Sequence, residues 1–187
     1  MGLRIRKKLK VNVEDITIDK LGISLENYNK EEKRIIVSLT TFPQRINTVH
    51  KTIKTLLNQT LKPNKVILYL ALSQFEKKEE ELPNNLLKLK DYGLEIKWCE
   101  DIKSYKKLIP ALEEFKDDII ITFDDDIYYP KDVVENLYNA HLAYPFAICS
   151  NRIWRIEVKN NFIKTKAAPY LYWKKYNKPD FLNGLRT

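Results

Sequence analysis

The chain contains few of the residues on which several common functional motifs depend. Its 187 residues include only 4 glycines, 2 cysteines and 2 histidines. Neither of the glycine-rich phosphate-binding patterns, GxGxxG or GxxxxGK(S/T), occurs in the sequence. The cysteines and histidines do not have the spacing of a zinc-binding motif. A glycine-rich phosphate loop and a zinc motif are therefore excluded as the basis of the function.

Long apolar runs are also absent. No stretch approaches the roughly 20 apolar residues of a membrane-spanning helix, and the basic residues 1–10 lack the apolar core of a secretory signal. Hydrophobic residues make up 44% of the chain and charges of both signs are frequent, which is typical of a soluble globular protein. We expect a basic extension over residues 1–30 and one domain over residues 31–187.

The formal net charge of +8 comes from the two ends of the chain. Residues 1–10 carry five basic and no acidic side chains, residues 151–187 carry nine basic and two acidic ones, and residues 11–150 have a net charge of −4. Basic ends of this kind suit an anionic membrane surface or an anionic acceptor, and nucleic acid is the less favoured partner. We expect a cytoplasmic protein with peripheral contact at the inner face of the membrane.

Apolar runs alternate with helical patterns from residue 34 onward. Strands are predicted at 34–40, 65–72, 94–98, 119–123 and 147–150. Helices are predicted between them, and the side chains expected to face inward from the later helices include Leu108, Ile109, Leu112, Phe115 and Leu142. The alternation predicts an α/β fold with a Rossmann-like, mostly parallel sheet and flanking helices, in which the loops after the strands converge on one cleft.

Three consecutive carboxylates, Asp124–Asp126, directly follow the predicted strand at 119–123. Buried parallel strands place their chemistry at the carboxyl end, and adjacent carboxylates repel one another unless a cation lies among them. A divalent cation that carries phosphate fits that position. The pattern predicts a metal and nucleotide site, whereas Asp117 and Asp118 are expected to be solvated loop charges.

Four stretches of the chain carry a resemblance when they are taken in order. Residues 35–45 form a strand with a Thr-Thr-x-Pro-x-Arg turn, and residues 101–112 are similar to a D-x-G-P-x-x-K-L-x-P-A-L segment. Residues 123–130 form a DXD strand end, and residues 151–156 an Arg-rich strand. Together they resemble the bacterial family 2-type glycosyltransferases of the GT-A fold that act in polysaccharide and capsule biosynthesis. The resemblance extends from about residue 34 to the C-terminus.

The resemblance implies a GT-A nucleotide-diphospho-sugar transferase fold. It implies transfer of a sugar from a nucleotide-diphosphate sugar, with a UDP-sugar as the expected donor, to a saccharide or lipid-linked acceptor. Asp126 and Asp124 would ligate Mn²⁺ or Mg²⁺, because oxygen ligands without a histidine cluster favour these ions over Zn²⁺. Asp124 would also face the ribose, and Lys107 would lie beside the diphosphate. The other residues that would line the nucleotide pocket are Thr41, Arg45, Asp101 and Asp125.

Two features depart from the family pattern. Lys103 and Ser104 stand where the pattern has Gly-Pro, which leaves the conformation of that loop open. The family continues to an acidic segment that holds the expected catalytic base, whereas this sequence stops at Thr187. We therefore expect a domain that is incomplete at its C-terminus, binds the donor, transfers sugar slowly or not at all, and self-associates through an exposed apolar edge. If the enzyme inverts the sugar, the resemblance implies that its base lies beyond Thr187.

Two other functions are compatible with the sequence. A haloacid-dehalogenase-like phosphotransferase also uses carboxylates at strand ends, although its nucleophile would follow the first strand, where residues 38–41 lie. A non-catalytic module that binds nucleotide sugars or nucleic acid would fit the basic ends. The aromatic and basic run at 170–176 could stack on a sugar or on a nucleotide base.

Overall fold

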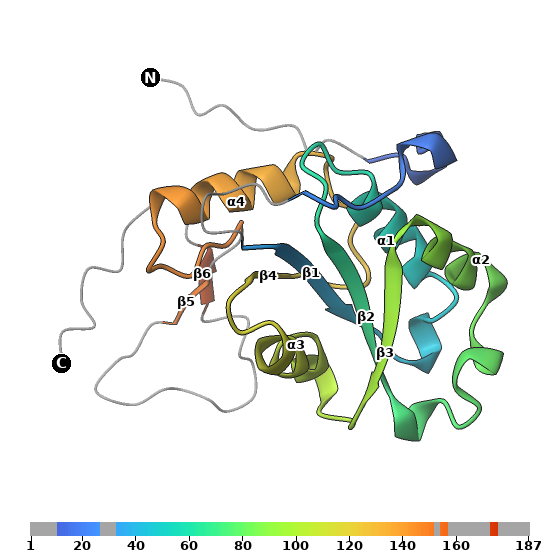
Figure 1. Ribbon diagram of the computed structural model, residues 1–187. Helices are drawn as coiled ribbons and strands as arrows, with labels where there is room; N and C mark the ends of the chain where they lie inside the picture. Colours follow the sequence, from blue (N-terminus) through green and yellow to red (C-terminus); the bar gives the residue numbers. More distant parts are fainter. Residues whose placement is uncertain (1–10, 27–32, 152–153, 157–172, 176–187) are drawn as a thin grey trace. The chain divides into compact units, whose positions relative to one another are not determined.

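The computed structural model of the chain describes residues 11–26, 33–151, 154–156 and 173–175. The chain divides into two compact units, residues 1–139 and 140–187. None of the described helices is long and apolar enough to span a membrane. The elements in chain order are β1 (Ile35–Thr40), α1 (Val49–Leu57), β2 (Lys65–Ala71), α2 (Asn84–Leu87), β3 (Leu94–Cys99), α3 (Ile109–Glu114), β4 (Ile119–Thr122), α4 (Val133–Ala143), β5 (Trp154–Ile156) and β6 (Trp173–Lys175) (Figure 1).

A four-stranded parallel sheet forms the centre of the first unit. Its strand order is β3-β2-β1-β4, and Val37 in the middle of β1 lies opposite Val66 on one side and Ile121 on the other. The chain thus moves outward from β1 through β2 to β3 and then crosses to the far side of β1. The prediction of an α/β fold with a parallel sheet is confirmed. In such sheets the reversal of strand order, here between β1 and β4, marks the usual ligand crevice.

Successive side chains of a strand point to opposite faces of the sheet, so different helices pack against the two faces. Ile35, Val37 and Leu39 belong to the larger core cluster, which includes the buried side of α1 and the start of α4. Ile36 belongs to the smaller cluster, with Phe115 next to α3. In Figure 1, α1 and α3 accordingly lie on opposite sides of the sheet. Burial on both faces explains the continuous apolar runs in the strands.

Residues 11–26 pack along the first unit without a long element of their own. The Gly22 amide donates to the Leu57 carbonyl at the end of α1, and the Ser24 amide donates to the Pro63 carbonyl. Ile23 lies against Gly93, where an added Cβ would come within 2.7 Å of the Ile23 side chain. Gly93 has a φ of 101° and ends the helical segment after α2, as its position in the sequence predicts.

Two predictions about the later elements are wrong. Residues 147–150 form no strand, and Phe146 and Ile148 are exposed instead. In α3 only Ala111 and neighbouring Phe115 are buried, while Leu108, Ile109 and Leu112 are exposed, as is Leu142 in α4. A helix as short as α3 brings one row of side chains onto the sheet, and the sequence pattern did not distinguish the row of residues 111 and 115 from the adjacent row of residues 108 and 112.

The prediction that Asp118 is a solvated loop charge is also wrong. Its side chain is 9% exposed and forms a salt bridge of 2.6 Å with Arg34. The same carboxylate accepts a hydrogen bond of 2.9 Å from the main-chain amide of Arg34. Asp118 therefore fastens the start of β4 to the start of β1, whereas Asp117 is exposed as expected.

The second unit contains one antiparallel pair of short strands among its described residues. In this pair Trp154 of β5 lies opposite Lys175 of β6. The basic residues 1–10, most of the basic stretch 151–187 and most of the aromatic run 170–176 lie outside the described residues.

Candidate functional site

A cavity of about 610 Å³ opens at the carboxyl ends of the parallel strands. Its wall includes residues that follow each of the four strands of the sheet. Among them are Thr41 and Arg45 after β1, Gln74 after β2, Asp101, Lys103, Ser104, Lys106 and Lys107 after β3, and Asp124–Asp126 after β4. The predicted convergence of the loops on one cleft is confirmed, and the cleft includes the ends of β1 and β4, where the strand order reverses.

The middle carboxylate of the triplet, Asp125, points into the protein. It is 8% exposed, and its Oδ2 accepts a hydrogen bond of 2.6 Å from the Thr41 hydroxyl. Its Oδ1 lies 2.7 Å from Nη1 of Arg45, and its main-chain oxygen accepts from the Thr52 hydroxyl of α1 at 2.9 Å. Asp125 is thus enclosed by groups from the turn after β1 and from α1, and it fixes the position of the arginine.

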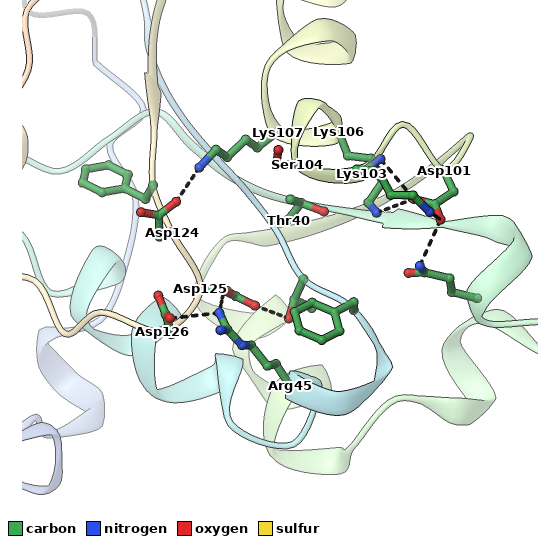
Figure 2. A pocket seen from close by; sticks show the side chains of 14 residues that line it. Thr40, Arg45, Asp101, Lys103, Ser104, Lys106, Lys107, Asp124, Asp125 and Asp126 are labelled. Carbon is green, nitrogen blue, oxygen red and sulfur yellow. Dashed lines mark hydrogen bonds and ion pairs between the residues drawn. The ribbon is translucent and has the colours of Figure 1, made fainter. Parts of the chain in front are cut away.

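The two outer carboxylates face the cavity. The side chains of Asp124 and Asp126 are 59% and 51% exposed. Nη1 of Arg45 reaches Oδ2 of Asp126 at 2.9 Å, so one guanidinium serves two consecutive aspartates (Figure 2). Its bond to Asp125, followed by the charges of both carboxylates, raises the pKa of Arg45 above its ordinary value. The guanidinium also lies 5.2 Å from the ring centre of Phe42.

Lys107 contacts the remaining member of the triplet. Its Nζ lies 2.5 Å from Oδ1 of Asp124, and its side chain is 23% exposed. The main-chain oxygen of Lys107 accepts a hydrogen bond of 2.6 Å from the hydroxyl of Ser38, which is fully buried in β1. The backbone of the lysine is therefore fixed to the sheet, and its flexible side chain reaches across the cavity, as Figure 2 shows.

Asp101 is the centre of a second polar group in the cavity wall. It accepts hydrogen bonds from the amide and Nζ of Lys103, from Nζ of Lys106 at 3.0 Å and from Nε2 of Gln74. The bonds from Lys103 and Lys106 hold the pKa of Asp101 well below its usual range. Lys106 is 3% exposed, so this ion pair is part of the folded wall. Asp101 lines the cavity as expected, with both oxygens bonded to protein groups.

The loop that departs from the family pattern keeps a conformation suited to glycine. Lys103, at the position of the glycine, has a φ of 57°, in the left-handed region that glycine adopts most easily. Its main-chain amide and its ammonium both bond to Asp101, which offsets the backbone strain. The structure thus answers the question that the sequence left open about this loop.

Tyr129 supports the turn that carries the triplet. The amide of Asp124 donates to Oη of Tyr129 at 3.0 Å, and the ring packs edge-on against Phe123 with centroids 4.6 Å apart. Burial of the phenol raises its pKa to about 12. Sequence reasoning identified neither this contact nor the roles of Ser38, Lys106 and Gln74, because each role depends on a partner 5 to 69 residues away that no local pattern indicates.

The predicted site residues lie in one cavity, and their chemistry limits which metal they suit. Within residues 11–26, 33–151, 154–156 and 173–175, no three His, Cys, Asp or Glu side chains are arranged to hold a metal ion. The protein therefore offers the two exposed carboxylates, Asp124 and Asp126, and only oxygen donors. This set fits Mg²⁺ or Mn²⁺, which use one or two carboxylates together with water and substrate phosphates.

The comparisons with known proteins returned one finding. A family model described as "Glycosyl transferase family 2" matches residues 36–185. No curated protein and no solved structure matches the chain at a significant level. The matched segment contains every residue of the cavity wall.

Proposed function

The chain belongs to glycosyl transferase family 2, and from that membership we propose that it transfers a sugar from a UDP-sugar to a saccharide or lipid-linked acceptor. The family shows the transferase class, and the parallel sheet with flanking helices agrees with the Rossmann-like GT-A fold. The donor, the acceptor and the divalent cation are the finer parts of the proposal. Bacterial capsule or polysaccharide synthesis would supply acceptors of this kind.

One observation carries the proposal, namely that two cationic side chains and two exposed carboxylates line the same cavity as ion pairs. Lys107 and Arg45 lie beside Asp124 and Asp126. A nucleoside diphosphate with a divalent cation has the complementary charges, because its phosphate oxygens suit the cationic side chains and its metal suits the carboxylates. A simple phosphate or a neutral sugar would match only part of this arrangement.

Different side chains of the cavity would bind the metal, orient the phosphate and shape the nucleotide pocket in the proposed complex. Asp124 and Asp126 would hold Mn²⁺ or Mg²⁺, which supplies neutralisation of the charge on the departing nucleoside diphosphate. Arg45, fixed by the buried Asp125, would orient a phosphate oxygen with its planar fork of donors. Thr41 and Asp125 would act through Arg45, and the Asp101 group would shape the wall of the nucleotide pocket.

A nucleotide panel read by thermal unfolding tests this function. We expect UDP with Mn²⁺ to stabilise the protein by about 2.7 kcal/mol at a hundredfold excess over the dissociation constant, and GDP, ADP or CDP to stabilise it less. Chelation of the metal should remove most of the effect. Equal stabilisation by UDP with chelator and with Mn²⁺ would contradict the metal-assisted site.

The alternatives receive less support from the structure. A haloacid-dehalogenase-like enzyme would have an aspartate nucleophile after the first strand, but Thr41 lies there and the carboxylates follow β4. A nucleic-acid module would use the basic ends of the chain, and its binding would fall steeply with salt and ignore Mn²⁺. Peripheral membrane attachment through those ends remains a proposal of the same kind, testable by sedimentation with anionic vesicles.

A further inference from the structure

We propose that Lys107 controls access of the divalent cation to Asp124, so that the metal binds well only when a nucleoside diphosphate is present to take the lysine ammonium. This inference rests on the proposed function and adds a role for one residue of the cavity. The ammonium of Lys107 lies 2.5 Å from Oδ1 of Asp124. It pairs with one of the two carboxylate oxygens that a cation would use.

The lysine can leave this position without any change in the fold. Its backbone is held by Ser38 of β1 through the main-chain oxygen, while its side chain is a flexible four-carbon stem with a compact charge at its end. Asp124 is 59% exposed and the Lys107 side chain 23% exposed, so the ammonium can swing away from an open carboxylate while most of the lysine stem stays against the cavity wall. Only the ion pair is exchanged.

Arg45 differs from Lys107 in this respect, although both pair with the triplet. Its Nη1 is held at 2.7 Å by Asp125, which is 8% exposed and also bonded to Thr41. Its guanidinium lies over the ring of Phe42. Arg45 is therefore a fixed cation of the cavity wall, whereas Lys107 is a movable one. We accordingly assign to Lys107 the exchange of a carboxylate partner for a phosphate oxygen.

Electrostatic competition at Asp124 then couples the binding of the divalent cation to the binding of the nucleoside diphosphate. With the ammonium on Asp124, a divalent cation meets a positive charge at a few ångströms and competes with it for the same carboxylate. When a diphosphate arrives, its oxygens accept the ammonium and Asp124 becomes available. Because coupling between two ligands is reciprocal, Mn²⁺ must raise the affinity for UDP by the same factor as UDP raises the affinity for Mn²⁺.

The test measures Mn²⁺ binding to the intact chain by electron paramagnetic resonance, in which free Mn²⁺ gives the signal. We expect weak Mn²⁺ binding to the wild type without nucleotide. Lys107→Met should strengthen binding of Mn²⁺ alone by about fivefold or more, the lower end of typical coupling factors, and should weaken binding of UDP in the presence of Mn²⁺. Circular dichroism and thermal unfolding confirm that each variant is folded.

Lys103→Met is the matched control. It removes the same charge from the same cavity, but the ammonium of Lys103 pairs with Asp101 rather than Asp124. We expect its affinity for Mn²⁺ alone to change by less than about twofold, because only a more distant repulsion is lost. Equal gains in both variants would mean that the charge of the whole cavity, rather than Lys107, controls the metal, and would overturn the inference.

The remaining outcomes separate this inference from the proposed function. If UDP binding requires Mn²⁺ but Lys107→Met gives no gain in affinity for Mn²⁺ alone, the function stands and the role of Lys107 is refuted. Tight binding of Mn²⁺ to the wild type without UDP also refutes that role. If Lys107→Met gains affinity for Mn²⁺ while UDP binds equally with chelator, Lys107 blocks the cation as described, but its coupling to a diphosphate and the metal-assisted function both fail.

Discussion

The hydroxyl of Ser38, fully buried in β1, donates a hydrogen bond of 2.6 Å to the main-chain oxygen of Lys107, 69 residues later in the chain. This bond joins the loop after β3 to the central strand of the sheet. It sets the point from which the lysine side chain reaches Asp124. A residue in the core of the sheet thus positions a cation of the cavity.

Ser38→Ala should therefore lower both stability and ligand affinity. The change leaves the Lys107 carbonyl without this donor, and we expect a loss of about 1 kcal/mol in the free energy of unfolding. Affinity for UDP with Mn²⁺ should fall as the lysine loses its anchor. Urea denaturation and calorimetry measure the two effects, with Ser73→Ala at an exposed position as the control. A stability loss with unchanged UDP affinity would show that the bond supports only the fold.

The middle and outer aspartates should respond differently to the same substitution. Asp125 is 8% exposed and bonded to both Arg45 and Thr41. Asp125→Asn should cost about 1–3 kcal/mol of stability, because a charge-assisted pair in the wall is broken. It should also weaken UDP binding, since Arg45 is no longer fixed. Urea denaturation and calorimetry measure both losses.

Asp126→Asn should weaken metal-assisted UDP binding strongly and change stability by less than about 0.5 kcal/mol, because this carboxylate is half exposed. Asp117→Asn is the control, since Asp117 is exposed and lies outside the cavity. Calorimetry with UDP and Mn²⁺ reports the binding. Matching losses of affinity in Asp126→Asn and Asp117→Asn would indicate a diffuse acidic surface rather than a site.

The sheet could be predicted because strands that are buried on both faces appear in the sequence as continuous apolar runs. The runs in β1, β2 and β4 are apolar and β-branched, and glycine or proline separates them from their neighbours. Residues 147–150 have a similar composition but form no strand. Composition predicts that a segment can pair, whereas pairing also needs a neighbouring strand edge at the right place.

The residues of the site could be predicted as a group but not as contacts. Strand ends meet at one edge of a parallel sheet, so the triplet, Arg45 and Lys107 were expected in one cleft. The division of the triplet into one inward and two outward carboxylates depends on Thr41 and Thr52. Those partners are set by tertiary packing, and the same is true of the salt bridge between Asp118 and Arg34.

That salt bridge predicts a pH dependence of stability. Burial alone would raise the pKa of Asp118, but its hydrogen bonds and attraction to Arg34 outweigh burial, so its pKa is lower than the ordinary value. A carboxyl group with a depressed pKa adds stability above its unfolded pKa of about 3.9 and loses that contribution as the pH falls through the folded value. The ion pair should therefore stabilise the protein at neutral pH and cease to do so in acid.

Asp118→Asn should lower the free energy of unfolding by about 1–3 kcal/mol at neutral pH. The difference from the wild type should shrink below about pH 4. Urea denaturation at a series of pH values measures it, with Asp117→Asn as the exposed control. UDP affinity should be unchanged in both variants, because neither residue lines the cavity. A difference that is constant down to the acid limit would show that the charge of Asp118 is not the stabilising element.

The hydroxyl of Tyr129 should matter for binding through the backbone of the triplet. Tyr129→Phe keeps the edge-on packing against Phe123 but removes the acceptor of the Asp124 amide. We expect a stability loss of about 1 kcal/mol and a weaker affinity for UDP with Mn²⁺, because the turn that holds Asp124 is less fixed. Tyr128→Phe is the control, since Tyr128 is exposed on the adjacent position. Calorimetry with UDP and Mn²⁺ measures the affinity of both variants, and urea denaturation measures their stability. Lost stability with full UDP affinity in Tyr129→Phe would show that the phenol supports the fold without positioning Asp124.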